Sequence, residues 1–385
     1  MELPETFTHG DIKTLQRLGH DVKVHCLLPP HRNRGELAEQ WNISAATDYP
    51  TLGMYLCGLF QAIRWPSAFL AALRCSFSGN RRLVHLLKGL MVIPRALELL
   101  SRYRQQRPDV VHLYWGHFPS IVGYVIKTAF PESTVTMFLG TYDLTTKFSG
   151  TTIMASAVDA IFTHAQANIP SIEAIGVDPK KVVLAYRGID PDYLDLPTLP
   201  KIQHSIVSVG ALEKPKGMHR VLEVFKRVQA ILPNASLAIL GDGEERNALE
   251  TLVERHQLQN VEITGYLPHQ EVLTRLRKAE VFLYLSDLES DRLPNAVKEA
   301  IAADCACIVS RTPGIEELVP PDGGFVVSAG DCDAACSAVF ASLSAAETIE
   351  RMKRKAKLNL TRHFNAHATM QIYVDKWSEL INRSL

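Results

Sequence analysis

The stretch from Ala279 to Leu318 constrains the fold of this chain more than any other. It contains two continuous apolar runs, at Val281–Leu285 and at Cys305–Ser310. Short apolar runs separated by a helix-length segment are typical of buried parallel strands joined by a crossover helix. We expect that helix to begin near Pro294 and Asn295, because proline fits the first helical turn, where no amide hydrogen is needed.

Two carboxylates flank the start of this expected helix. Open α/β sheets bind ligands at the carboxyl ends of their strands, and helix N-termini bind phosphate groups. Asp291 lies in the loop before the helix, and Glu299 lies about one turn inside it. Both side chains can hold sugar or ribose hydroxyls beside a bound diphosphate. The stretch therefore predicts a site for a phosphate-bearing ligand.

A second phosphate-binding segment is predicted after the apolar strand at 205–209. Gly210 follows this strand, and Lys216 and Gly217 directly precede a helix that we expect to begin at Met218. Backbone amides of a glycine-bearing loop can contact a diphosphate, and the ammonium of Lys216 can place a positive charge on it.

These segments together resemble a known family. The pattern D-x-x-P-N-x-x-x-E-A, followed by a strand and by P-G-I-E-E-L-V, is similar to the donor-site signature of retaining glycosyltransferases of family 4. The resemblance implies the α/β GT-B fold, in which two Rossmann-like domains face a cleft and a C-terminal helix crosses back to the first domain. It also implies a UDP- or GDP-linked sugar as substrate, with no cofactor and no metal.

The resemblance assigns roles to particular residues. Lys216 and Asp291 are the predicted catalytic residues, with Lys216 on the leaving diphosphate and Asp291 on the donor sugar. Glu299 and Asn295 would contact the ribose or nearby groups. The predicted donor-binding residues are Gly210, Lys216, Gly217, Gly243, Tyr266, Leu267, Asp291, Leu293, Pro294, Asn295 and Glu299.

The segments at Gly243 and at Tyr266-Leu267 complete this predicted site. Gly243 belongs to a turn that resembles the family's L-x-G-x-G, which packs near the nucleotide. The backbone at Tyr266 and Leu267 follows the next strand, and in the family this backbone pairs with the base. The inferred reaction is transfer of the sugar to a hydroxyl of a lipid-linked saccharide, with retention at the anomeric carbon, in polysaccharide or glycan biosynthesis.

Three positions depart from the family pattern. Ala211 stands where the family has an arginine, Gly140 where it has a histidine, and Asp291 where it has a glutamate. Lys214 and Arg292 are candidates to replace the missing cation. These departures favour an alternative, a degenerate and non-catalytic member that acts as a nucleotide-binding or membrane-associated partner protein. A nucleotide-sugar epimerase of the same fold and a membrane-bound scaffold are further alternatives.

The N-terminal half resembles the family more loosely. Residues 4–27 resemble the opening P-x-x-S-E-T-F-I of a subgroup that builds exopolysaccharides, colanic acid among them. In that subgroup a buried strand precedes the motif, so here either the first strand is missing or the start of the sequence is truncated. Further along, His112 is expected to be a core residue, and His117 is the better functional candidate. We predict an acceptor-side domain at 1–196, a nucleotide-sugar-binding domain at 201–364 and a crossing helix at 365–385.

Residues 50–107 combine apolar pieces with basic residues, and their only acid is Glu98. This pattern suits helices that lie on a membrane surface, and it equally suits ordinary helices that pack on the first sheet with solvated charges. The first reading predicts a cytoplasmic protein that is peripheral at the inner face of the membrane. The nine basic residues are Arg64, Arg74, Arg81, Arg82, Lys88, Arg95, Arg102, Arg104 and Arg107.

Net charge and cysteine spacing argue against a nucleic-acid-binding protein and against a zinc-binding or disulfide-rich one. The formal net charge is +0, so bulk electrostatics do not favour a nucleic-acid partner. The seven cysteines are scattered without zinc-finger spacing, which indicates reduced thiols rather than a metal site or a disulfide framework. No secretory signal and no run of about 20 apolar residues is apparent.

Overall fold

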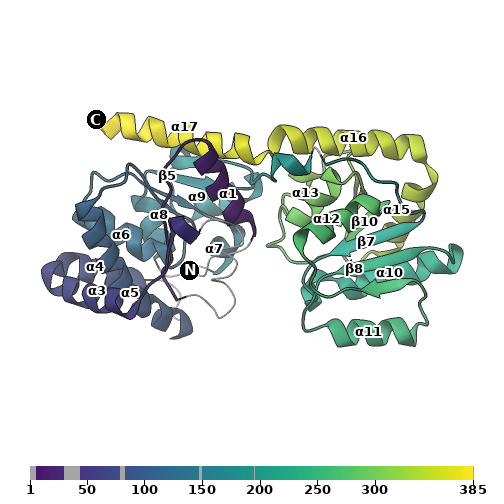
Figure 1. Cartoon of the computed structure of the whole chain (residues 1–385), viewed down its shortest axis with the longest axis horizontal. Helices are drawn as coiled ribbons and strands as arrows, with labels where there is room; N and C mark the ends of the chain where they lie inside the picture. Colours follow the sequence, from purple (N-terminus) through teal and green to yellow (C-terminus); the bar gives the residue numbers. More distant parts are fainter. Residues whose placement is uncertain (1–5, 30–43, 79–82, 147–149, 195, 385) are drawn as a thin grey trace. The chain divides into compact units, whose positions relative to one another are not determined.

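The computed structural model describes residues 6–29, 44–78, 83–146, 150–194 and 196–384. The chain divides into two compact units (Figure 1). The first comprises Met1–Arg187 with Ala366–Leu385, and the second comprises Gly188–Asn365. Each unit contains a parallel sheet and its own cluster of buried apolar side chains, so the predicted α/β class is confirmed.

The second unit is built on a six-stranded parallel sheet of order β12-β11-β10-β7-β8-β9. The chain runs outward from β7 to β9, returns to β10 beside β7, and then runs outward in the other direction. This is the strand order of dinucleotide-binding domains, and the reversal between the two central strands opens a crevice for ligands. The strands are β7 (Ser205–Val209), β8 (Ser236–Leu240), β9 (Val261–Ile263), β10 (Val281–Tyr284), β11 (Ala306–Ser310) and β12 (Phe325–Val327).

Central strands of this sheet are buried along their whole length, as the continuous apolar runs predicted. The predicted strand at Val281–Leu285 corresponds to β10, and the helix expected near Asn295 is α13. The helices of this unit are α10 (Met218–Ile231), α11 (Arg246–Arg255), α12 (His269–Lys278), α13 (Asn295–Ala302), α14 (Ile315–Leu318), α15 (Cys332–Ser344) and α16 (Ala346–His363).

The first unit contains a four-stranded parallel sheet of order β3-β4-β5-β6 and a separate two-stranded parallel pair, β1-β2. Its strands are β1 (Val24–His25), β2 (Thr47–Asp48), β3 (Val111–Leu113), β4 (Val135–Phe138), β5 (Ala160–Thr163) and β6 (Val182–Leu184). The predicted absence of an opening strand stays a prediction, because residues 1–5 lie outside the described residues.

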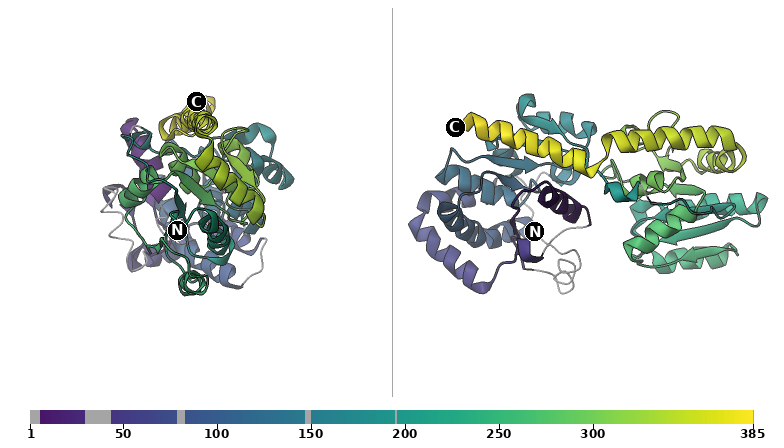
Figure 2. Two further views of the ribbon diagram at one scale, coloured as in Figure 1. Left: turned by 90° about the vertical axis from the view of Figure 1, so that its right-hand side faces the viewer. Right: turned by 45° about the horizontal axis from the view of Figure 1, so that its top comes forward.

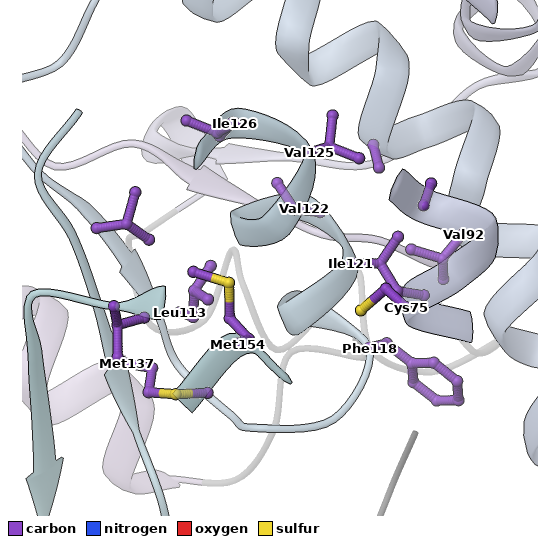
Figure 3. Close-up of a cluster of buried hydrophobic side chains, with 14 of the residues drawn as sticks. Cys75, Val92, Leu113, Phe118, Ile121, Val122, Val125, Ile126, Met137 and Met154 are labelled. Atoms are coloured by element: carbon purple, nitrogen blue, oxygen red, sulfur yellow. The ribbon is translucent and has the colours of Figure 1, made fainter. Parts of the chain in front are cut away.

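Helices of the first unit cover this sheet and pack on one another. They are α1 (Thr6–Arg17), α3 (Leu52–Arg64), α4 (Pro66–Phe77), α5 (Leu83–Gln105), α6 (Pro119–Ala129), α7 (Thr141–Thr146), α8 (Thr151–Ala157), α9 (Ile169–Ala174) and α17 (Ala366–Ser384). Figure 3 shows part of the core that they enclose, where Cys75 of α4 and Val92 of α5 lie near Ile121 of α6.

Helix α17 belongs to the first unit and lies beside α1 (Figures 1 and 2). The indole N–H of Trp377 donates a hydrogen bond of 3.0 Å to the Thr136 hydroxyl on β4. The ring of Tyr373 stacks on Phe162 of β5 with centroids 3.8 Å apart. The aromatic residues at the end of the chain therefore cover the first sheet, as the resemblance implied.

His112 on β3 packs among aromatic side chains, as predicted, and its own side chain is half-buried. Its Nδ1 lies 2.9 Å from the Thr136 hydroxyl, and its ring packs edge-on against Phe162 and Tyr373. Burial, together with the charge of Arg187, lowers the pKa of His112 to about 3. The imidazole is therefore neutral at physiological pH.

Helix α3 is unusual because its small and polar residues face inward. Gly58 and Gln61 are its buried residues, whereas the large apolar side chains spaced along the opposite side are exposed. A Cβ on Gly58 would lie 1.7 Å from the Pro94 carbonyl oxygen, so α3 and α5 cross with their backbones nearly in contact. The exposed apolar residues of α3 are Leu52, Leu56, Leu59, Phe60 and Ile63.

No single helix among the described residues is long and apolar enough to cross a membrane. Taken together, α3 and α4 are long and apolar enough, but the chain bends by 112° at the break between them.

The close crossing at Gly58 predicts a strong effect of one added methyl group. Gly58→Ala should lower the free energy of unfolding by about 1–3 kcal/mol, because the helices must separate to admit the Cβ. Gly53→Ala on the same helix meets only the Thr51 hydroxyl at 3.9 Å, so it should be neutral or stabilising by up to about 1 kcal/mol. Urea unfolding of both variants measures the difference; equal effects would show that the crossing is loose.

Candidate functional site

The predicted site residues all lie at one edge of the second unit's sheet. Strands β7 and β10 are neighbours, so the loops that follow them flank the point where the strand order reverses. The predicted residues follow the strands as the sequence analysis proposed: Gly210, Lys216 and Gly217 follow β7, Gly243 follows β8, Tyr266 and Leu267 follow β9, and Asp291, Leu293, Pro294, Asn295 and Glu299 follow β10.

Backbone hydrogen bonds tie three of these loops together. The amide of Gly210 donates to the Leu240 carbonyl at 3.1 Å, and the amide of Leu212 donates to the Asp242 carbonyl at 3.0 Å. The amide of Gly241 donates to the Gly265 carbonyl at 3.2 Å. The loops after β7, β8 and β9 therefore form one connected surface beside the central crevice.

Lys216 and Asp291 form an ion pair across the reversal point. The Lys216 ammonium lies 2.9 Å from both carboxylate oxygens of Asp291, and the two side chains are 20% and 14% exposed. Sequence spacing alone did not predict this contact, because 75 positions separate the two residues. The structure thus brings the two predicted catalytic residues together as a partly buried, preorganised pair.

Two residues that the sequence analysis did not single out support this pair. The Tyr284 hydroxyl donates to Oδ2 of Asp291 at 2.7 Å, and the Ser286 hydroxyl donates to the same oxygen at 2.6 Å. Burial and the Asp291 charge raise the pKa of Tyr284, so its hydroxyl stays protonated as a donor. Tyr284 is the last residue of β10 and Ser286 lies two positions beyond it, so the alternation of side chains along an extended chain places both on the same side. That alternation was the available signal.

The conformation of Gly217 allows the loop to turn directly into α10. Its φ of +73° lies in the left-handed region. A Cβ at this position would lie 2.1 Å from the Leu285 carbonyl oxygen, at the end of β10. Only glycine fits here, so Gly217 sets how closely the Lys216 loop approaches the loop that carries Asp291.

The N-terminal turn of α13 faces the same region. Pro294 is its N-cap residue, and Leu293 before it is buried. The buried ammonium of Lys298 donates to Oδ1 of Asn295 at 3.1 Å and lies 5.6 Å from the centroid of the Phe364 ring. Lys298 thus fixes the Asn295 side chain at the helix end that we predicted to accept an anion.

Glu299 takes part in a chain of three side chains. Its Oε1 lies 3.0 Å from Nε2 of His269, and Nδ1 of His269 lies 3.3 Å from the Tyr193 hydroxyl. The hydrogen bond to Glu299 raises the pKa of His269, and burial opposes this shift. Burial, together with the charges of Asp190 and Glu299, raises the pKa of Tyr193 to about 12. Glu299 is therefore oriented by a histidine that sequence reasoning missed.

The two candidates for a replacement cation lie in different surroundings. Arg292 is buried, and burial lowers its pKa while the charges of Glu289 and Glu317 oppose the shift. Lys214 is exposed. A third cation, Arg220, donates to the Leu285 carbonyl at 2.8 Å and pairs with Asp287. Lys216 is thus the cation that the structure places against the predicted catalytic carboxylate.

Tyr266 and Gly243 lie on the exposed part of the same edge. The Tyr266 side chain is 82% exposed, and Leu267 beside it is half-buried. A Cβ on Gly243 would lie 2.6 Å from the Leu212 carbonyl oxygen, so this turn sits directly against the loop after β7. The described residues contain no group of three or more His, Cys, Asp or Glu side chains that could hold a metal ion.

In the first unit, the loops after β3 and β4 meet at a buried carboxylate. Asp143 accepts the amides of Gly116 at 3.0 Å and Gly140 at 3.1 Å, and it lies 3.1 Å from Nδ1 of His117. The imidazole predicted to be functional is therefore oriented by Asp143. His117 lies in the loop after β3, and Asp143 links this loop to Gly140, the position where the family has its own histidine.

Most of the second unit matches a family of known proteins. Residues 197–359 match the family model described as glycosyl transferases group 1. WcaL of Escherichia coli K12, described as a colanic acid biosynthesis glycosyltransferase, is 30% identical over 207 residues, which cover 50% of each chain. The sulfoquinovosyl transferase SQD2 of Arabidopsis thaliana is 27% identical over 206 residues, which cover 51% of this chain and 39% of the relative.

The chain spans about half the length of the WcaL proteins it matches, and less of SQD2. Among solved structures, Anabaena Alr3699/HepE in complex with UDP has a TM-score of 0.74 at 12% identity and covers 98% of both chains. A glycosyltransferase from Rickettsia africae has a TM-score of 0.69 at 13% identity and covers 97% of this chain and 94% of its own. These structural matches establish that the chain has the GT-B fold.

The His269–Glu299 pair predicts a pH-dependent contribution to stability. Because the pKa of His269 is raised above its ordinary value of 6.5, the pair stabilises the fold fully below pH 6.5, and this stabilisation is lost as the pH rises through the raised pKa. Urea unfolding should therefore show that His269→Gln costs more free energy at acidic than at basic pH. In a Glu299→Gln background the same substitution should show no such pH dependence; its persistence there would assign the effect elsewhere.

Proposed function

Because residues 197–359 match the model of the glycosyl transferases group 1 family, we propose that this chain is a member of that family and that it transfers a sugar from a nucleoside-diphosphate sugar to a hydroxyl group. The acceptor is a lipid-linked saccharide, and the reaction retains the configuration of the anomeric carbon. The product belongs to polysaccharide or glycan biosynthesis. The protein works in the cytoplasm, where the acceptor is presented at the inner face of the membrane.

The observation that carries this proposal is the Lys216–Asp291 pair at the reversal point of the second sheet. A leaving nucleoside diphosphate develops negative charge as the sugar departs. The Lys216 ammonium and the N-terminus of α13 both stabilise negative charge at this edge of the sheet. These groups offset part of the charge of the diphosphate, and the proposed reaction uses no metal ion.

The carboxylates of Asp291 and Glu299 bind hydroxyl groups of the donor. Oδ2 of Asp291 accepts hydrogen bonds from Lys216, Tyr284 and Ser286, whereas among the described residues only Lys216 donates to Oδ1. Oδ1 keeps the capacity for another donor, so it can receive a hydroxyl of the donor sugar. Glu299, oriented by His269, and Asn295 contact the ribose or neighbouring groups.

The rest of the predicted edge binds the nucleotide base. The backbone at Tyr266 and Leu267 pairs with the base, and the Gly243 turn lies beside it. Support comes from the GT-B neighbours HepE with UDP and HepE with UDP-glucose, whose fold this chain shares. No protein base is required in the proposed reaction, because the leaving phosphate takes the proton of the acceptor hydroxyl.

A second candidate function is a non-catalytic nucleotide-binding member of the family. Ala211 and Gly140 favour it, since each lacks a side chain that would contact the donor. The position of His117 argues for the enzyme, because Asp143 holds an imidazole in the loop next to Gly140. Turnover separates the two candidates, since both bind nucleotide.

Titration with UDP- and GDP-sugars tests the donor site. Lys216→Ala should weaken binding of the preferred donor at least tenfold, because the variant loses the cation that faces the diphosphate. The matched control is Lys226→Ala, which removes an exposed lysine from α10 and should leave affinity unchanged. Equal affinity of wild type and Lys216→Ala would mean that the diphosphate binds elsewhere.

Product analysis tests the reaction itself. Wild type incubated with the donor and membrane lipid extract should form a glycolipid whose anomeric proton reports the donor's own configuration by NMR. Asp291→Asn should lower kcat by roughly 100-fold or more while the nucleotide alone still binds. Donor binding without any transfer or hydrolysis by wild type would establish the non-catalytic alternative.

A further inference from the structure

Exposed apolar side chains gather on three helices of the first unit. Of the seventeen large hydrophobic residues that are exposed in the described part of the chain, eleven lie in α3, α4 and the first turns of α5. On α3 they follow helical spacing from Leu52 to Ile63, so they form one continuous stripe. Such an accumulation on a folded surface marks a site of interaction rather than ordinary scatter. We call these eleven exposed apolar side chains the apolar face; they are Leu52, Leu56, Leu59, Phe60, Ile63, Leu70, Phe77, Leu83, Val84, Leu87 and Met91.

The stripes on α3 and α5 belong to neighbouring helices. Helix α5 exposes Leu83, Leu87 and Met91 in its first turns. Three residues after Met91, α5 meets α3 at the crossing of Pro94 with Gly58. Figure 1 shows α3, α4 and α5 grouped at the same end of the first unit. Because Gly58 faces inward against α5, the apolar stripe of α3 faces outward.

The charges around the apolar face have a single sign. Arg64, Arg74 and Lys88 are exposed on α3, α4 and α5. The only acid between residues 50 and 107 is Glu98, which is buried and paired with Arg95 and Arg102. The exposed charges described in this region are therefore all basic, and the surface complements a negatively charged one.

We propose that the apolar face binds the surface of a bilayer that contains anionic phospholipids. The apolar side chains of α3 and α5 enter the boundary between headgroups and acyl chains, while Arg64, Arg74 and Lys88 contact lipid phosphates. Helix α3 is only about 20 Å long, too short for a hydrocarbon core of about 30 Å, so it lies in the interface instead of spanning it. This surface is in a different unit from the donor site, and its membrane binding does not depend on sugar transfer.

A second copy of this chain is a poorer occupant of the apolar face. A two-fold symmetric interface would bring identical surfaces together, so each basic residue would approach the basic residues of the other copy. No exposed acid in the described part of 50–107 would balance them. An anionic bilayer buries the same apolar side chains and neutralises the same charges.

Vesicle flotation with the full chain tests the proposal. Wild type should float with vesicles of phosphatidylcholine containing about 30% phosphatidylglycerol, and it should float at least tenfold less with pure phosphatidylcholine or at high salt. Phe60→Ser with Ile63→Ser should reduce flotation at least tenfold, since two exposed apolar side chains are lost. Arg64→Glu with Lys88→Glu should reduce flotation on anionic vesicles alone.

Leu358→Ser is the matched control. Leu358 is 69% exposed on α16 of the second unit, close to the 65% of Phe60, and its replacement should not change flotation. A fluorophore on the exposed thiol of Cys57 gives an independent readout on α3, after Cys332 and Cys336 are replaced by serine. Its emission should shift to the blue with anionic vesicles.

Three results would overturn the proposal. One is wild type that fails to float with anionic vesicles while its circular dichroism and donor binding are normal. Another is equal loss of flotation in Leu358→Ser and in the α3 variant. The third is a dimer by light scattering that Phe60→Ser with Ile63→Ser converts to a monomer, without vesicle binding by wild type, which would identify a second copy as the occupant. Donor titration reports on the other unit, so its failure would leave the flotation result intact.

Discussion

The ion pair between Lys216 and Asp291 depends on a single topological constraint, the reversal of strand order between β7 and β10. Because these strands are neighbours, two loops that are far apart in the sequence meet at one edge of the sheet. Gly217 permits the close approach, and Tyr284 and Ser286 hold the carboxylate from the end of β10. A charge pair fixed in this way is oriented before a ligand arrives, which is the condition for effective electrostatic stabilisation.

Much of the second unit could be predicted from its sequence. Continuous apolar runs predicted the central strands, and Pro294 marked the start of α13 within one residue. Side-chain partners could not be predicted in the same way. The partner of Glu299 is His269, which begins another helix, and no local pattern links residues that meet only through the sheet. Local periodicity determines the elements, whereas their contacts depend on topology.

The first unit shows where sequence patterns stop being informative. An apolar stripe at helical spacing ordinarily predicts the buried face of a helix. In α3 that stripe is exposed, because Gly58 and Gln61 allow α5 to approach from the other side. Membrane-surface and core-packing interpretations of residues 50–107 predict the same spacing. Only the position of the neighbouring helix distinguishes them, and that position is a tertiary property.

The placement of α17 has a consequence for how the chain acquires its structure. Trp377 and Tyr373 cover β4 and β5, so the first unit is assembled from two segments with the whole second unit inserted between them. Gly188–Asn365 is continuous and can complete its core while translation is still in progress. The N-terminal segment cannot complete its core until α17 has been synthesised. Until then, the side of its sheet that Trp377 and Tyr373 cover stays exposed.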